Sequence, residues 1–502
     1  MNEPAPAPSP TGPAWKRHAV TALLILGSLA YGGLLWRYVS PHAGGSDPSG
    51  YFNSAKLITH GRLFAPARIL PGHSPAEFGD YATVPLGFVP RSDGRLAPTY
   101  PTGYPLHLAA ASVFGWSHAA PVANVLTAIA SGLLLFAYAR RLGFSRGLAL
   151  GGVALLWFCP LFLFAAMMPM SDLPALGWVL AALYCSLEAR NSWRWGLLCG
   201  LSVGVAVLVR PTNLLLAVPV VAAVGFRPRS WLAVVAGGLP AAIFLGLYNR
   251  STYGSSLATG YGDVSASFSA AFLPHNLSHF AHWIPVLLSP LVLLALASPF
   301  VACVRQRGFV ALIIWAVTLV GFYGFYYHTG ETWWYLRFIL PAFPALILAM
   351  LAVLHAFGQA GRARPRFFAG LSACLVALAA VWQIRQIQPL DVLHLEESER
   401  TYPEAARWAK RELPPRSVIF CMQVSGAFFY YTDFVLFRWD FVAKENLPQL
   451  FAAIHRDNRP VYAVLYEFEQ QDALGRLGGQ WRQVAEIRNA RVWQLVPALP
   501  AP

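Results

Sequence analysis

Residues 170–190 read MSDLPALGWVLAALYCSLEAR, and this stretch decides the fold. The run is mostly apolar, with an acid, Asp172, near its start and a base, Arg190, at its end. A helix that crosses a bilayer needs about 20 mostly apolar residues. The stretch therefore predicts a membrane-spanning helix whose two ends carry opposite charges.

The composition of the whole chain agrees with a membrane protein. Of its 502 residues, 56% are hydrophobic and only 12% are charged, and the mean hydropathy is +0.48. A soluble globular domain carries roughly 25% charged residues, so a soluble core could not absorb this much apolar surface. The six cysteines form no CxxC pair, and no disulfide framework is expected.

The net charge of +14 does not indicate nucleic-acid binding. The basic residues come in small groups between apolar runs and are not gathered into one stripe, which membrane topology explains better. The partner that the composition predicts is the bilayer.

The same length rule, applied along the chain, predicts about eleven spans. Their centres lie near Leu26, Ile129, Leu156, Leu180, Gly204, Val218, Ala242, Leu291, Val317, Leu348 and Val376. With the N-terminus in the cytoplasm, every link that faces the cytoplasm carries arginine, as the positive-inside bias requires. These arginines are Arg140, Arg141, Arg146, Arg190, Arg194, Arg227, Arg229, Arg305, Arg307, Arg362, Arg364 and Arg366.

This threading divides the chain into three parts. Residues 1–16 form a disordered cytoplasmic tail, and residues 17–386 form the transmembrane domain. The first apolar run is longer than the ~7 to 15 residues of a signal peptide and is expected to stay as an anchor. Two loops, 40–104 and 249–282, and a C-terminal domain, 387–502, lie outside the cytoplasm, so the protein is placed in the plasma or inner membrane.

The first outer loop is expected to contain a helix that lies flat on the membrane. Asp47 followed by Pro48 has the pattern of an N-cap and a first helical residue, and Gly61 is placed to end the helix. The apolar residues at helical spacing between them are Tyr51, Phe52, Ala55 and Ile58.

The C-terminal tail has a different pattern. Its apolar runs are too short to span a membrane and fall at 418–420, 461–465, 484–487 and 492–496. Helical stretches at 403–412 and 447–456 lie between them. This alternation predicts a small soluble α/β domain.

The common motifs of soluble enzymes do not occur in the chain. There is no GxxxxGK[ST] loop, no HExxH and no DxD pair. The candidates for chemistry are instead the polar residues at the outer ends of the spans, namely Asp47, Asp172, Arg210 and Arg337.

Each candidate also has a purely structural interpretation. Asp47 and Asp172 could simply cap helix N-termini, and Arg210 suits a helix C-terminus. Arg337 stands at the outer N-terminal end of a helix, against both the dipole preference and the positive-inside bias, unless it pairs with Glu331 or extends to the interface. The functional alternative for Asp47 is a general base at a membrane-facing cavity.

Several short motifs occur in a familiar order along the membrane part, about residues 19–354. They are the early Asp47, 51-YFNSAKLI-58 with Gly61, 100-YPTGYP-105, 171-SDLP-174, 208-LVRP-211, Tyr248-Asn249 with 253-YGS-255, and 335-YLRF-338 with Pro341 and Pro344. In order and spacing the chain resembles the GT-C class of membrane glycosyltransferases. It is most similar to the group of protein O-mannosyltransferases and lipid A aminoarabinose transferases.

The resemblance implies an activity. A sugar would move, with inversion, from a polyprenyl-phosphate donor to an extracytoplasmic acceptor such as a glycolipid, lipopolysaccharide, another polysaccharide or a protein. Asp47 and Asp172 match the two acidic positions of the family and are the expected catalytic residues. The residues expected to bind the donor phosphate are Arg337, Arg210 and Tyr335. The expected substrate contacts are Tyr100, Tyr104, Tyr261 and Glu331. No cofactor is required, and a divalent metal stays open.

Two further readings stay beside the enzyme. A polytopic transporter would place its ionisable residues near mid-membrane and show repeated halves. A non-catalytic glycolipid-binding protein would tolerate loss of Asp47. The chain also departs from the protein mannosyltransferases, which carry Asp-Glu where this sequence has Asp47-Pro48, and that difference speaks against a protein acceptor.

Overall fold

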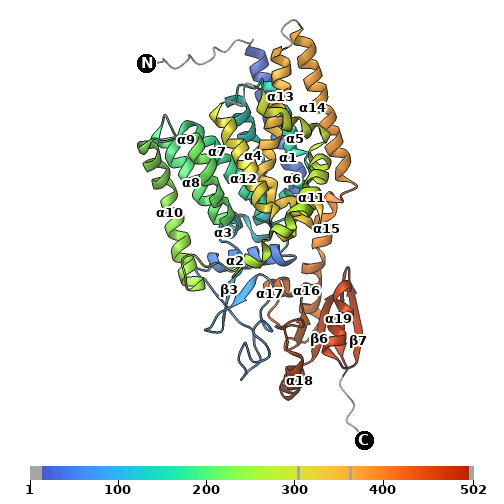
Figure 1. Ribbon diagram of the computed structural model, residues 1–502. Coiled ribbons are helices and arrows are strands. Elements are labelled where there is room, and N and C mark those ends of the chain that lie inside the picture. The colour runs from blue at the N-terminus through green and yellow to red at the C-terminus, as the bar shows by residue number, and fades with distance from the viewer. Residues whose placement is uncertain (1–13, 302–305, 361–363, 497–502) are drawn as a thin grey trace.

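The computed structural model describes residues 14–301, 306–360 and 364–496. A bundle of helices occupies the upper part of the molecule, a smaller part with strands lies below it, and α2 (Ser46–Thr59) runs across the boundary (Figure 1). The tail expected at 1–16 falls mainly on residues 1–13, which lie outside the described residues, as do Arg305 and Arg362.

The bundle is built from helices that lie between residues 14 and 387 of the described chain. They are α1 (Ala14–Tyr38), α3 (Gly103–Ala111), η1 (Ser112–Phe114), α4 (Trp116–Arg141), α5 (Arg146–Trp157), α6 (Pro160–Met167), α7 (Asp172–Glu188), α8 (Trp193–Val209), η2 (Pro211–Leu216), α9 (Ala217–Val224), α10 (Pro228–Tyr253), η3 (Ser265–Ser267), η4 (Ala270–Phe272), α11 (Leu273–Leu288), η5 (Pro290–Phe300), α12 (Arg307–Gly324), η7 (Tyr327–Gly330), η8 (Trp333–Ala342), α13 (Phe343–Ala360) and α14 (Pro365–Ile387).

Every predicted span centre falls inside one of these helices. By length and apolarity, 6 helices among the described residues can cross a membrane, or up to 8 if each bent pair is one span. The bent pairs are α5 with α6, at 59°, and the 270–288 helix with η5, at 106°. In both pairs the second helix begins at a proline, Pro160 or Pro290, because proline cannot continue the hydrogen-bond ladder of the first.

Helices α8 and α10 pack at backbone contact. A methyl group added at Gly200 would lie 1.8 Å from the carbonyl oxygen of Val234, and one at Gly237 would lie 2.0 Å from that of Leu197. Gly196 and Gly204 stand one turn before and after Gly200 on the same face. Small residues every fourth position are the usual way for membrane helices to approach closely.

Helices α1, α13 and α14 reach the upper end of the bundle in Figure 1, and several of the arginines predicted to face the cytoplasm lie near one another in the structure. Arg141, Arg190 and Arg307 line one surface pocket there. Arg227 also donates from Nη1 to the carbonyl oxygen of Arg190 at 3.0 Å. Connections between spans that are far apart in the sequence thus lie at the same end of the bundle. The alternating direction of successive spans requires this arrangement.

The lower part is built on a mixed sheet of five strands. Its strands are β4 (Val418–Cys421), β5 (Val435–Arg438), β6 (Val461–Tyr466), β7 (Trp481–Ile487) and β8 (Ala490–Leu495), in the order β5-β4-β6-β8-β7. Strands β5, β4 and β6 are parallel, and β8 and β7 continue the sheet antiparallel. The prediction of an α/β fold is confirmed, although β5 carried no recognised signal in the sequence.

Short helices surround this sheet. They are η9 (Val392–His394), α15 (Leu395–Glu399), α16 (Thr401–Glu412), α17 (Ser425–Tyr431), η10 (Lys444–Asn446), α18 (Leu447–Arg456) and α19 (Glu467–Leu477). The helical stretches predicted at 403–412 and 447–456 coincide with α16 and α18.

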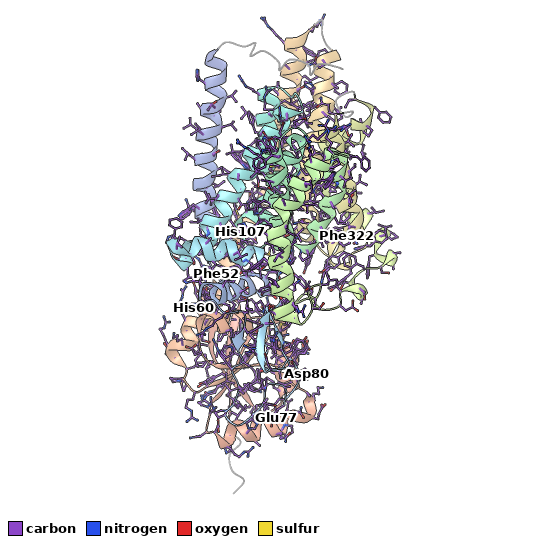
Figure 2. The ribbon with its side chains drawn as sticks, turned by 90° about the vertical axis from the view of Figure 1, so that its left-hand side faces the viewer. Phe52, His60, Glu77, Asp80, His107 and Phe322 are labelled. Atoms are coloured by element: carbon purple, nitrogen blue, oxygen red, sulfur yellow. The ribbon has the colours of Figure 1, made fainter. Side chains whose placement is uncertain are left out.

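The first loop completes the core of the lower part. It forms a small antiparallel sheet from β1 (Ala65–Pro66), β2 (Phe88–Pro90) and β3 (Arg95–Pro98), and its 70–82 segment packs on the five-stranded sheet. Phe78 stacks edge-on against Phe437 with ring centres 6.0 Å apart. Figure 2 shows Glu77 and Asp80 of this segment among the side chains of the lower part.

Helix α2 differs from the helix predicted on the membrane surface. It does run across the end of the bundle, and Gly61 (φ +63°) follows its last turn as expected. However, residues 48–55 are all buried, because the bundle covers one side of α2 and the C-terminal region covers the other. Asn53, for example, donates to the carbonyl oxygen of Gly426 at 3.0 Å. The helix is therefore enclosed by protein rather than lying on lipid.

The α8–α10 contact leads to a test. Gly200→Ala should lower the melting temperature of the detergent-solubilised protein, because the new methyl group collides with the backbone of α10, and overpacking costs about 1–3 kcal/mol. The matched control is Gly246→Ala, also in a helix of this pair, where the nearest atom to the added methyl is 3.9 Å away. Equal melting temperatures for the two variants would contradict the close packing.

Candidate active site

Four charged side chains meet at the end of the bundle opposite the arginine-lined pocket. Asp47 lies in the first turn of α2, and Asp172 is the first residue of α7. Arg210 directly follows α8, and Arg337 lies in η8, which leads into α13. The ends of four elements thus converge on one place.

The local sequence explains where these elements end. Arg210 precedes Pro211, and a residue before proline is pushed out of the helical region, so α8 stops and Arg210 is extended (φ −145°, ψ 116°). Pro48 and Pro174 stand in the first turns of α2 and α7, where their missing N–H groups cost nothing. Prolines therefore fix the helix ends that carry Asp47, Asp172 and Arg210.

The four charges form a linked set of ion pairs. Nη2 of Arg210 lies 2.6 Å from Oδ1 of Asp172, and Nη1 of Arg337 lies 2.9 Å from Oδ2 of Asp47. The same Nη1 of Arg337 is 3.9 Å from Oδ2 of Asp172. Arg337 is thus shared by both carboxylates, and two negative charges balance two positive ones.

The set is buried unevenly. The side chain of Asp172 is 1% exposed, and those of Arg337 and Arg210 are 10% and 13% exposed. Asp47 keeps 26% of its side chain exposed. Of the four residues, Asp47 is therefore the one that a second molecule can reach most easily.

Three polar atoms of this set have no hydrogen-bond partner. They are Oδ2 of Asp172, Nη1 of Arg210 and Nε of Arg337, and all three are buried. Buried polar atoms are nearly always hydrogen-bonded, so an orphaned donor in a protein interior calls for an explanation. Two guanidinium groups with free N–H donors at one site provide the means to bind an anion.

Hydroxyl groups surround the ion pairs. Ser171 accepts from Nε of Arg210 at 3.1 Å and from the hydroxyl of Tyr51 at 2.9 Å. Tyr100 and Ser46 share a hydrogen bond of 2.8 Å. Burial raises the pKa of Tyr51 and of Tyr100 above the ordinary tyrosine value, and the charge of Asp47 adds to both shifts. Both phenols therefore stay neutral.

Aromatic rings cover the guanidinium of Arg337. The Cζ atom of Arg337 lies 5.6 Å from the ring centre of Tyr335 and 5.3 Å from that of Phe338. The ring of Phe338 also lies 5.4 Å from the guanidinium of Arg210. Cation–π contacts of this kind favour a fixed guanidinium orientation.

The capping interpretations are wrong for both aspartates. Helix α2 begins at Ser46 with Gly45 as N-cap, and α7 has Ser171 as N-cap, and neither helix has a side-chain cap hydrogen bond. The carboxylates are used in ion pairs instead. The alternative pairing of Arg337 with Glu331 is also wrong, because Glu331 pairs with His328 at 2.7 Å.

The other expected contacts lie at different distances from the charges. Tyr261 packs on Tyr100 with ring centres 6.0 Å apart. Tyr104 is fully buried and donates to Oδ1 of Asn124 at 2.8 Å, which makes it part of the packing behind Tyr51. Tyr51 and Ser171 were not among the predicted site residues. Ser171 directly precedes Asp172, and Tyr51 lies one helical turn after Asp47.

Comparisons with known proteins agree with this architecture. The family model described as dolichyl-phosphate-mannose-protein mannosyltransferase matches residues 108–248. No curated protein matches the sequence.

Three solved structures share the fold. ArnT from Cupriavidus metallidurans bound to undecaprenyl phosphate is 14% identical, with a TM-score of 0.60, and the match covers 95% of this chain and 99% of that one. The oligosaccharyltransferase of Archaeoglobus fulgidus is 14% identical, with a TM-score of 0.54 and coverage of 93% and 72%. Arabinofuranosyltransferase AftD from Mycobacteria is 11% identical, with a TM-score of 0.55 and coverage of 95% and 40%.

The chain has the fold of the GT-C class of membrane glycosyltransferases, which confirms the resemblance inferred from its motifs. Among the three structures described, ArnT also agrees with this chain in length, since each is covered almost completely.

The buried pair of Asp172 and Arg210 yields a stability prediction. Asp172→Ala should lower stability by about 3–5 kcal/mol, because it leaves a buried guanidinium without its counter-charge. The double variant Asp172→Ala/Arg210→Ala should regain much of that loss. Melting of the purified protein in detergent measures both, and Glu486→Ala, which breaks an exposed pair with Arg491, is the control. A double variant no more stable than the single one would contradict this account.

Proposed function

We propose that the protein is an inverting glycosyltransferase that moves a sugar from a polyprenyl-phosphate donor to an acceptor outside the cytoplasm. The observation that carries the proposal is the pair of buried arginines with unpartnered N–H donors beside a partly exposed carboxylate. The GT-C fold supports the same reading.

The two arginines are suited to the donor phosphate. A guanidinium presents planar N–H donors that match phosphate oxygens in pairs. Nη1 of Arg210 and Nε of Arg337 are free for such contacts. Among proteins of this fold, ArnT is described with undecaprenyl phosphate and an archaeal oligosaccharyltransferase with dolichol-phosphate, which supports a lipid phosphate as the ligand here.

Asp47 is the proposed general base. In the reaction its carboxylate takes the proton of the acceptor hydroxyl while that oxygen attacks the anomeric carbon. The bond between that carbon and the phosphate oxygen breaks, and polyprenyl phosphate leaves with the bonding electrons. Attack opposite the leaving group inverts the anomeric configuration.

The arginines contribute to this step through charge. As the sugar leaves, negative charge grows on the phosphate, and two fixed cations stabilise it without reorganisation. The deep burial of Asp172 suits it to orienting Arg210 rather than to accepting a proton from substrate. The proposed reaction requires no cofactor or metal, since the two guanidinium groups supply the positive charge.

The membrane topology is part of the proposal. We place the arginine-lined end of the bundle in the cytoplasm by the positive-inside bias, with about eleven crossings in the plasma or inner membrane. The candidate site and the C-terminal domain are then extracytoplasmic. A donor with a polyprenyl tail would reach Arg210 and Arg337 from the bilayer.

The rival functions are less well supported. A transporter would be expected to carry ionisable groups near mid-membrane, whereas these four lie at helix ends. A non-catalytic glycolipid-binding protein would use the arginines without needing Asp47. The acceptor class, whether a glycolipid such as lipopolysaccharide, a polysaccharide or a protein, follows from the acceptor test below.

The first test is turnover in proteoliposomes. A panel of polyprenyl-phosphate sugars is offered with glycolipid, polysaccharide and peptide acceptors, and one donor should be consumed. Asp47→Asn should lower kcat by about 10²- to 10⁴-fold, as loss of a general base does, while binding of undecaprenyl phosphate survives. Full activity in Asp47→Asn would reject the general-base assignment, and a wild-type protein that consumes no donor would reject the enzyme.

The second test concerns the phosphate site. Arg337→Ala should weaken binding of undecaprenyl phosphate by about tenfold to a hundredfold, because a hydrogen bond to a charged group contributes about 1.5–3 kcal/mol. Arg250→Ala is the matched control, since Arg250 is an exposed arginine in the last turn of α10. An unchanged dissociation constant in Arg337→Ala would count against the phosphate role.

A further inference from the structure

The short connection between α1 and α2 carries Asp47 into the site. At its start it is tied to the bundle, because the N–H of Ser40 donates to the carbonyl oxygen of Met167 at 2.8 Å. From His42 onward its long-range partners come from the C-terminal region, more than 350 residues away in the sequence. The two ends of this connection are therefore held by different parts of the protein.

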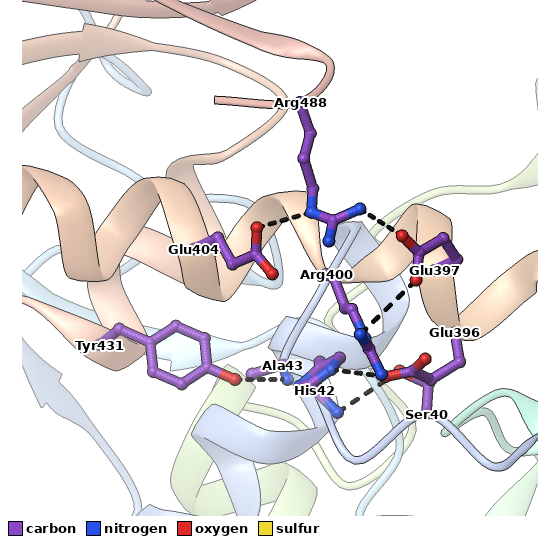
Figure 3. Close-up of polar contacts among 9 residues, drawn as sticks. All are labelled: Ser40, His42, Ala43, Glu396, Glu397, Arg400, Glu404, Tyr431 and Arg488. Atoms are coloured by element: carbon purple, nitrogen blue, oxygen red, sulfur yellow. Dashed lines mark hydrogen bonds and ion pairs between the residues drawn. The ribbon is translucent and has the colours of Figure 1, made fainter. Parts of the chain in front are cut away.

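Three contacts from the C-terminal region hold the connection. Nε2 of His42 lies 3.2 Å from a carboxylate oxygen of Glu396, and the N–H of Ala43 donates to the hydroxyl of Tyr431 at 3.0 Å (Figure 3). The N–H of Gly45 donates to Oε2 of Glu399 at 3.2 Å. The last contact is the nearest in sequence to Asp47, only two residues before it.

The Glu399 contact completes the N-terminus of α2. Gly45 is the N-cap of α2 and has no side chain to offer. In a capping box the N–H of the N-cap is bound by a glutamate of the same helix, three residues on. Here the glutamate comes from α15, and its carboxylate also lies where the dipole of α2 favours negative charge.

Gly44 shows how closely Glu399 fits. A methyl group added there would lie 1.6 Å from Oε2 of Glu399 and 3.3 Å from the ring of Tyr402. Gly44 is not among the residues with positive φ, so space and not backbone conformation excludes a side chain. The glutamate therefore occupies the volume that an ordinary residue at 44 would fill.

The carboxylates of Glu399 and Asp47 also interact electrostatically. Burial raises the pKa of Glu399 to about 7, the charge of Asp47 adds to that shift, and the N–H of Gly45 opposes it. The charge of Glu399 in turn adds to the raised pKa of three nearby phenols, those of Tyr402, Tyr431 and Tyr466. This coupling places Glu399 in the electrostatic surroundings of the proposed base.

We propose that Glu399 is a positioning residue for sugar transfer: it holds the Gly44–Gly45 turn and thereby sets where Asp47 stands opposite Arg337. The inference rests on the proposed function, because it assigns Glu399 a role through Asp47. The C-terminal domain is then a working part of the membrane site, although it adds no side chain to the four charges.

The experiment uses the full-length protein and the donor that the wild type turns over. Glu399→Ala should lower kcat by roughly tenfold to a hundredfold, as expected for a displaced catalytic group, and leave binding of undecaprenyl phosphate unchanged. Glu399→Gln should keep most of the activity, since its amide oxygen can still accept from Gly45. The control is Glu397→Ala on the same helix, whose carboxylate faces Arg488 instead (Figure 3).

A double-variant cycle separates positioning from general damage. Gly44→Ala alone should lower kcat, because the new methyl group displaces Glu399. In the Glu399→Ala background the same change should cost little, since the colliding carboxylate is gone. The two effects are therefore expected to be strongly non-additive.

The outcomes are distinct. Wild-type kcat in Glu399→Ala, or a loss of undecaprenyl phosphate binding equal to the loss of kcat, overturns the positioning role while the proposed function stands. Additive effects of Gly44→Ala and Glu399→Ala also overturn it. A wild-type protein that neither consumes a donor nor binds undecaprenyl phosphate overturns the proposed function, and the inference with it.

Discussion

The structure depends on one electrostatic constraint: two guanidinium groups at the end of a membrane bundle must be paired. An unpaired charge away from water is too costly to keep, so each arginine needs a carboxylate within reach. Arg210 obtains it from the start of α7, and Arg337 obtains it chiefly from α2. Satisfying both arginines brings four separate elements to one place. The ion pairs stabilise the cluster, whereas the buried N–H groups left without a partner cost stability and remain able to donate to a further acceptor.

This constraint explains why α2 is enclosed. A helix that delivers Asp47 to a buried arginine cannot move freely on a lipid surface. The bundle holds one side of α2, where Tyr51 reaches Ser171, and the C-terminal region holds the other, where Lys56 donates to the carbonyl oxygen of Tyr430 at 3.2 Å. Burial lowers the pKa of Lys56 to about 8, which reflects how much water this second contact excludes. The C-terminal region thus contacts the helix that carries Asp47 and is packed directly against the candidate site.

The sequence predicts which charged residues form the candidate site better than it predicts the residues that contact them. Apolar length and arginine bias locate the helices, and the four residues that break the pattern are the four that meet. The partners of these residues are not predictable, because Asp47 and Arg337 are separated by most of the bundle and no local pattern records their pairing. For the same reason, the sequence does not predict the packing of Phe78 on Phe437 or the strand β5. Tyr104 illustrates the converse: an aromatic at a helix end has the same signal whether it faces a ligand or, as here, a buried asparagine.

The shared core of the first loop and the tail has a consequence for biogenesis. The 70–82 segment emerges early in synthesis, yet the strands it packs against are not made until the last hundred or so residues. At roughly 5–20 residues per second, the ribosome needs tens of seconds to supply them. During that interval the apolar face around Phe78 has no native partner and α2 is covered on one side only. The loop therefore stays exposed until the C-terminal strands are made, and a chain truncated before β4 would leave a membrane bundle with an exposed, aggregation-prone segment.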